Sequence, residues 1–137
     1  MRIAPRLPLP RAILLAFLAG PACGNSVGGP DRDTVWVVEV SGEEFRIRVS
    51  DETARAGIDQ RLRSRERGVV IGSLVRGDGG FNSPWSWHLD PATVQAVDTA
   101  IELCDGRPGM VEADLDYWIG TVRTFCPWGA RVTRREQ

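Results

Sequence analysis

The residues best suited to binding or catalytic chemistry lie close together between positions 79 and 90. The segment Gly79-Gly-Phe-Asn-Ser-Pro-Trp-Ser-Trp-His-Leu-Asp90 contains the one histidine of the 137-residue chain. Aromatic side chains beside amide and carboxylate groups are suited to binding sugars or peptides. The candidate ligand surface of the sequence therefore consists of Phe81, Asn82, Trp85, Trp87, His88 and Asp90.

The same segment is also compatible with a structural role. Trp85, Trp87 and Leu89 alternate with polar residues, which is typical of a strand with one face in the core. In that arrangement the two tryptophans are buried and His88 lies on the outer face. Ligand binding and core packing both remain open at this point.

The residue types argue against most enzyme classes. A single histidine excludes a multi-histidine zinc site, and the sequence has no nucleophile-elbow motif. Ser86, His88 and Asp90 share one face of the expected strand, so a small hydrolase that uses His88 is kept as an alternative. We expect no catalytic residue, no cofactor and no metal ion.

The first 22 residues have the composition of a secretory signal peptide. Three arginines precede an apolar run over residues 12–19, and small residues follow this run up to Ala22. The apolar run is much shorter than the roughly 20 residues that a membrane-spanning helix needs. Residues 1–22 are therefore predicted to be a signal peptide, and the protein is expected to be exported.

The three cysteines support this prediction and suggest how Cys23 is modified after cleavage of the signal peptide. An odd number of cysteines in an exported protein needs an explanation. A lipid on Cys23 and a disulfide between Cys104 and Cys126 would use all three. However, Gly20 stands where a lipoprotein signal prefers leucine, so ordinary cleavage that leaves Cys23 free or paired between chains stays open. We favour an envelope lipoprotein that contacts the membrane only through Cys23.

The charge balance gives no sign of a nucleic-acid partner. The formal net charge is −1, and the 17 basic residues, all arginines, are nearly matched by 18 acids. Removal of the leader makes the remainder more acidic, so it has no basic footprint for nucleic acid. The arginines between positions 61 and 67 are typical of a solvated helix end. The expected partner is an unknown extracytoplasmic protein or a glycan.

The pattern of apolar residues predicts a small α+β domain after a flexible tether over residues 23–33. The expected order is an antiparallel sheet of about five or six strands with two helices. Strands are expected at 34–40 and 44–49 as a hairpin, at 69–76, near 85–89 and at 128–133. The domain is placed at 34–133 and a polar tail at 134–137.

Two helices complete the predicted domain. The first begins after Ser50-Asp51-Glu52 and is ended by Gly68, with acids first and arginines last. The second covers residues 110–119, where apolar residues are spaced at helical intervals, and is ended by Gly120. Residues 94–104 fit either a helix or a strand, and we favour a strand after a short turn.

Several motifs in one order resemble a known family. In chain order they are VRGDGGFN at 75–82, PWSWHLDP at 84–91, IELCDG at 101–106, VEADLDYW at 111–118 and FCPWGARV at 125–132. Together they resemble small bacterial secreted proteins and the N-terminal domain of a eukaryotic calmodulin-binding protein, over about residues 34–133. The resemblance supplies no catalytic residues to transfer to this chain.

These observations together favour a non-enzymatic binding or interaction module of the cell envelope. Phe81 to Asp90 is its expected contact surface. A secreted inhibitor of a peptidase, presenting the same loop, is an alternative from another class. The small hydrolase that uses His88 is the third hypothesis.

Overall fold

Two antiparallel sheets and the helices around them make up the part of the chain described by the computed structural model, residues 33–137. The predicted signal peptide, Cys23 and all of the predicted tether except Asp33 lie outside these residues. In chain order the strands are β1 (Val35–Val40), β2 (Glu43–Ile47), β3 (Val69–Arg76), β4 (Trp87–Leu89), β5 (Gln95–Val97), β6 (Thr124–Phe125) and β7 (Arg131–Glu136).

The first sheet has the order β2-β1-β7. Its β1–β2 hairpin, which the sequence predicted, turns at Ser41 and Gly42, both with positive φ (52° and 82°). β7 returns from the far end of the chain to pair with the other edge of β1. Because β7 continues to Glu136, residues 134–136 belong to the sheet, and the prediction of a polar tail there was wrong.

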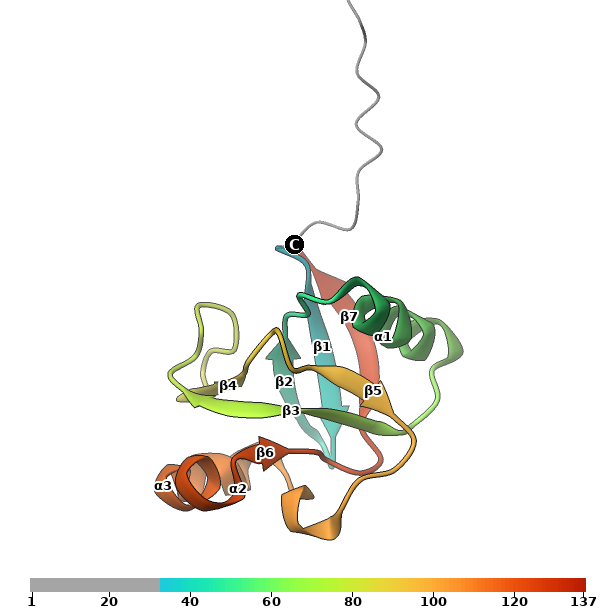
Figure 1. Cartoon of the computed structure of the whole chain (residues 1–137). Coiled ribbons are helices and arrows are strands. Elements are labelled where there is room, and N and C mark those ends of the chain that lie inside the picture. The colour runs from blue at the N-terminus through green and yellow to red at the C-terminus, as the bar shows by residue number, and fades with distance from the viewer. Residues whose placement is uncertain (1–32) are drawn as a thin grey trace, which may run out of the picture.

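The second sheet is built around β3. The strands β4 and β5 pair with the two halves of β3 and are separated by a turn. Within that turn, Asp90 N–H donates to Ser73 O and the Thr93 hydroxyl accepts from Ser73 N–H. β6 pairs with the opposite edge of β3, where Leu74 N–H donates to Arg123 O. In Figure 1, β3 runs across the strands of the first sheet.

The core lies between the two sheets. Buried side chains from both sheets and from α1 meet there, with an aromatic centre formed by Phe45, Trp87 and Phe125. The ring centroids are 5.5 Å apart for Phe45–Phe125 and 5.3 Å apart for Trp87–Phe125. The predicted α+β class is confirmed. The difference is that the strands form two sheets, because β3 crosses the first sheet and does not extend it.

The helical elements are α1 (Glu52–Ser64), a 3₁₀ turn η1 (Glu102–Cys104), α2 (Pro108–Ala113), α3 (Leu115–Tyr117) and a π turn η2 (Trp118–Val122). The Asp51 carboxylate caps α1 by accepting from Ala54 N–H at 2.8 Å. Arg65 (φ 57°) ends this helix, three residues before the predicted stop at Gly68. No described helix is long and apolar enough to cross a membrane.

The second predicted helix, 110–119, is divided in the structure. It starts earlier, at Pro108, and breaks at Asp114, whose backbone leaves the helical region (φ −146°, ψ 68°). The Asp114 carboxylate then accepts from Tyr117 N–H and starts the next turn. The π turn continues through Gly120 and ends at Arg123 (φ 67°), so Gly120 does not end the helix.

A disulfide joins η1 to the segment after β6. Cys104 and Cys126 are bonded with their Cα atoms 5.1 Å apart and 22 residues apart in sequence, which confirms the predicted pairing. Within residues 94–104, only Gln95–Val97 form a strand, and η1 occupies the end. The preference for a strand was therefore correct for the first part of this segment alone.

Candidate binding site

Asn82, predicted to contact a ligand, instead joins two parts of the domain. Its side chain has no exposed surface. The Asn82 Oδ1 atom accepts from Arg46 N–H of β2 at 2.6 Å, and its Nδ2 donates to Trp87 O at 2.8 Å. A buried amide with both ends paired is a structural group. The loop from Gly77 to Ser86 is thereby fixed against the outer edge of β2.

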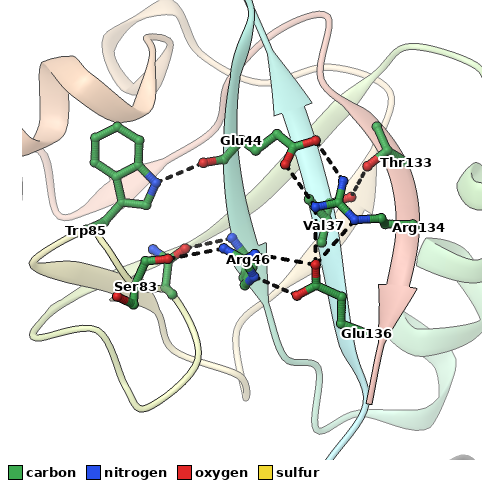
Figure 2. Close-up of polar contacts among 9 residues, drawn as sticks. Val37, Glu44, Arg46, Ser83, Trp85, Thr133, Arg134 and Glu136 are labelled. Carbon is green, nitrogen blue, oxygen red and sulfur yellow. Dashed lines mark hydrogen bonds and ion pairs between the residues drawn. The ribbon is translucent and has the colours of Figure 1, made fainter.

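Trp85 and Ser83 strengthen the same attachment. The Trp85 indole N–H donates to Glu44 O at 2.8 Å, and Ser83 O accepts from the Arg46 guanidinium at 3.1 Å (Figure 2). β2 is an edge strand, so its outward backbone groups would otherwise lie unpaired. The loop supplies partners for these groups at Glu44 and Arg46. It covers the sheet edge as a neighbouring strand would.

A charged network continues from this edge across the first sheet. Arg134 of β7 donates to Glu44 at 2.7 Å and to Glu136 at 3.1 Å, and Arg46 donates to Glu136 at 2.7 Å (Figure 2). The hydrogen bond from Arg134 lowers the pKa of Glu44, and the hydrogen bond from Arg46 lowers the pKa of Glu136. All of these charges are paired with each other, which leaves this face no strong preference for a charged ligand.

Phe81 and His88 form a small corner at the exposed side of the loop. Their rings meet edge to face with centroids 5.5 Å apart, and the Arg48 guanidinium lies 5.0 Å from the Phe81 centroid. His88 Nδ1 is 2.6 Å from Gly77 O, so this nitrogen carries the proton and donates. The corner is held by contacts within the domain, and both rings are half-buried.

The three residues of the hydrolase hypothesis have separate partners. The Ser86 hydroxyl donates to Glu112 at 2.7 Å, while His88 pairs with Gly77 O. The Asp90 carboxylate accepts from Ala92 N–H in the turn that follows β4. Since the serine and the histidine are each bonded elsewhere, this geometry does not prepare a nucleophile. No group of three or more potential metal-ligating side chains occurs in residues 33–137.

The structure therefore corrects the predicted ligand surface. Trp87 and Asn82 have no exposed surface and cannot contact a ligand in this conformation. Trp87 faces the core because it alternates with His88 along β4, the structural alternative that the sequence left open. Phe81, Trp85, His88 and Asp90 keep partial exposure, and among them Trp85 attaches the loop to Glu44 O.

A second surface has the character of a binding site. It is an apolar cavity of about 360 Å³ beside the disulfide, here called the apolar groove. Its lining residues are Ile71, Ala100, Ile101, Leu103, Cys104, Val122 and Thr124. Ile101 and Leu103 are 68% and 60% exposed, although they are large aliphatic residues. Concave apolar surfaces with few polar groups are the usual form of ligand pockets.

The apolar groove lies on the outer face of the second sheet. Ile71 points away from the core, because its neighbours Val70 and Gly72 are the buried positions of β3. The disulfide fixes η1 against this face and holds Ile101 and Leu103 near the end of β6. A smaller polar hollow, lined by Ser73, Thr93 and Gln95 among others, shares Ile71 and Thr124 with the groove.

The sequence analysis missed this groove for a physical reason. In the strand favoured for residues 94–104, Ile101 and Leu103 alternate with polar residues, and such alternation predicts burial on one face. In the structure the chain turns into η1 at Glu102, which leaves both side chains outside. The available signal was the closeness of this aliphatic pair to Cys104, since a disulfide can hold an exposed segment in place.

The comparisons with known proteins yield one family. The family model described as the BP-74 N-terminal domain matches residues 32–137, and it agrees with the resemblance to the N-terminal domain of a calmodulin-binding protein. No curated protein and no solved structure matches the chain. The matched range begins just before the first described residue and ends at Gln137, so it covers both sheets, the loop and the apolar groove.

Proposed function

Because the chain belongs to this family of calmodulin-binding-protein N-terminal domains, we propose that it is a non-enzymatic binding module of the cell envelope. The family suggests a binding or interaction module and leaves the ligand open. The observation that carries the proposal is the apolar groove, where two large aliphatic side chains remain exposed on a surface fixed by a disulfide. Large exposed apolar side chains gathered at a hollow are typical of interaction sites.

Export of the protein is part of the proposal and is supported by two features. Residues 1–22 have the composition of a signal peptide. Structural disulfides are characteristic of oxidising compartments outside the cytoplasm, and the Cys104–Cys126 bond is of that kind. A lipid on Cys23 would then attach the domain to the membrane from its N-terminal side.

The hydrolase and inhibitor alternatives have less support. A hydrolase would require His88 to activate a nucleophile, whereas His88 and Ser86 have separate partners. An inhibitor loop must present side chains to a peptidase, whereas Asn82 and Trp85 bind the edge of β2. Neither alternative has an observation that favours it over binding.

The experiment that tests the proposal uses the full chain produced in an export-competent bacterial host. Mature protein is recovered from envelope fractions, and its N-terminus is examined by mass spectrometry. We expect cleavage before Cys23, diacylation of this residue, and specific co-purification of an envelope component with the wild-type protein. Uncleaved cytoplasmic protein would contradict export, and turnover of an ester or peptide substrate that is lost in His88→Ala would contradict a non-enzymatic role.

A further inference from the structure

We propose that the apolar groove binds an extended segment of a partner protein, which inserts one large aliphatic or aromatic side chain next to a basic residue. This inference rests on the proposed binding function and names the site and the class of partner. It is carried by the size and lining of the groove, by the polar hollow that continues it, and by the charges beside it.

The size of the groove suits a single inserted side chain. A volume of about 360 Å³ is at the lower end of the range for small-molecule pockets. Ile101, Leu103 and Val122 all line the groove. Burial of a large apolar side chain here would also remove Ile101 and Leu103 from water. Apolar surface of both partners would then contribute to the free energy of binding.

The polar hollow explains why the partner segment should be extended. It adjoins the groove at Ile71 and Thr124 and offers the side chains of Ser73 and Gln95, whereas the Thr93 hydroxyl is already paired with Ser73 N–H and Asp90 O. Gln95 is exposed, and no hydrogen bond of its side chain occurs within the described residues. The backbone of an extended segment needs hydrogen-bond partners along its length when it leaves water. A compact apolar ligand would fill the groove and leave these groups unused.

The charges around the exposed wall favour a basic neighbour for the inserted side chain. The segment from Asp98 to Asp105 carries no basic residue and three acids, of which Asp98 pairs with Arg61 and Asp105 accepts from two backbone N–H groups. Glu102, between Ile101 and Leu103, is exposed and makes no ion pair within the part of the chain that the structure describes. Arg123, which follows the lining residue Val122 in the chain, has its Nε donating to Gly120 O. An arginine or lysine beside the inserted side chain would pair with Glu102 at the rim.

The groove and the two ends of the described chain lie at opposite sides of the domain. The described chain begins and ends at one pole of the molecule, while η1 and α2 lie at the other (Figure 1). β1 therefore begins at the pole opposite η1, whose residues Leu103 and Cys104 line the groove. A flexible tether over residues 23–33, as the sequence predicts, would let a domain attached through Cys23 present the groove to other envelope components.

The test uses a phage-displayed library of random dodecapeptides, selected on the intact mature protein. We expect enriched peptides that combine one large apolar residue with an adjacent arginine or lysine. Synthetic copies should shift the methyl NMR signals of Ile71, Ile101 and Leu103. Leu103→Ser should weaken their binding at least tenfold and Glu102→Gln about threefold. Met110→Ser is the matched control because Met110 is exposed and lies outside the groove, and it should change binding less than twofold.

The opposing outcomes are distinct. Peptide binding that is insensitive to Leu103→Ser would show that the peptides do not bind in the apolar groove, while the proposed binding function would still hold. If the library yields no peptide that binds the wild-type protein, the proposed partner class is wrong. Leu103-dependent binding to phosphatidylglycerol vesicles would identify a lipid surface instead. A Leu103-dependent dimer in sedimentation experiments would identify a second copy of the chain. Thermal melts of each variant check that the fold is retained, as expected for a residue that is 60% exposed.

Discussion

At the scale of single residues, Asn82 shows how a polar side chain becomes part of the fold. It pairs the Arg46 N–H of β2 with the Trp87 C=O at the start of β4, and its side chain is fully buried. A buried donor or acceptor that loses its partner costs about 1–3 kcal/mol. Asn82 therefore affects the stability of the domain and the position of the loop. Its buried side chain is not available to a ligand.

Replacement of Asn82 should accordingly destabilise the domain. Asn82→Ala leaves the buried Trp87 C=O and the partly buried Arg46 N–H without partners, and we expect the free energy of unfolding to fall by about 2–4 kcal/mol. Urea denaturation followed by tryptophan fluorescence measures the change. Ser83→Ala is the control, because only the backbone of Ser83 takes part in the contact. A loss below about 0.5 kcal/mol would show that water replaces the amide without cost.

Gly79 provides a second residue-scale prediction with a control next to it. Gly79 and Gly80 both have positive φ (63° and 77°), so an added Cβ strains both positions alike. At Gly79 the Cβ would also lie 2.8 Å from ring atoms of His88 and Phe81, whereas at Gly80 it meets nothing within 4 Å. Gly79→Ala should therefore cost at least about 1 kcal/mol more than Gly80→Ala in urea denaturation. Equal losses would show that the His88 and Phe81 rings move aside at little cost in free energy.

The candidate site could be predicted from the sequence only in part. The unusual composition of residues 79–90 correctly marked a segment with special contacts. It did not distinguish a ligand surface from the cover of a sheet edge, since both use amide and indole groups. The partner of Asn82 is 36 residues away in the chain, and no local pattern specifies such a contact. Likewise, the exposed position of Leu103 depends on the turn at η1, which no local pattern specified.

At the scale of elements, local signals gave correct predictions where the element is stabilised locally. The β1–β2 hairpin and the start of α1 depend on a short turn and a capping aspartate, and both were predicted. The second helix was wrong in detail because its apolar spacing does not reveal the break at Asp114. The division into two sheets was not predicted, because pairing between β1 and β7 depends on contacts across almost the whole domain.

The cap of α1 leads to a prediction for that element. Asp51 accepts from Ala54 N–H and carries a negative charge at the positive end of the helix. Asp51→Ala should reduce the free energy of unfolding by about 1 kcal/mol, while Asp51→Asn, which keeps the acceptor, should lose clearly less. Thermal and urea denaturation at pH 7 provide the comparison. Equal effects of the two substitutions would mean that charge, and not the hydrogen bond, is the main contribution.

The charged network between β2 and β7 predicts a dependence on pH. The folded-state pKa values of Glu44 and Glu136 are lowered by hydrogen bonds from Arg134 and Arg46. Carboxylates with a lowered pKa stabilise the fold above their unfolded pKa, and this contribution is lost as the pH falls through the folded value. Stability should therefore decline below about pH 4.5. The effect should be small and sensitive to salt because the residues of the network are partly or fully exposed to solvent.

Arg134→Gln tests whether this network is the source of the acid sensitivity. The variant removes the donor to both Glu44 and Glu136. The decrease in stability between pH 7 and pH 3 should be smaller in Arg134→Gln than in the wild type, with urea denaturation at each pH as the measurement. Arg63→Gln is the control, since Arg63 is exposed on α1 outside the network. An unchanged pH profile in Arg134→Gln would assign the acid sensitivity to carboxylates other than Glu44, including Glu136 through its remaining bond from Arg46.

At the scale of the whole molecule, the disulfide connects stability with the proposed function. It closes a loop of 22 residues in sequence separation, for which chain entropy predicts a contribution of about 3 kcal/mol. Cys104→Ala with Cys126→Ala should lose roughly this amount in urea denaturation. Because Cys104 lines the apolar groove, the variant should also bind groove-dependent peptides more weakly under conditions where it is still folded. Full stability loss with unchanged peptide affinity would mean that η1 keeps its position without the bond, and that the groove is shaped by packing on Ile71 and Val122 alone.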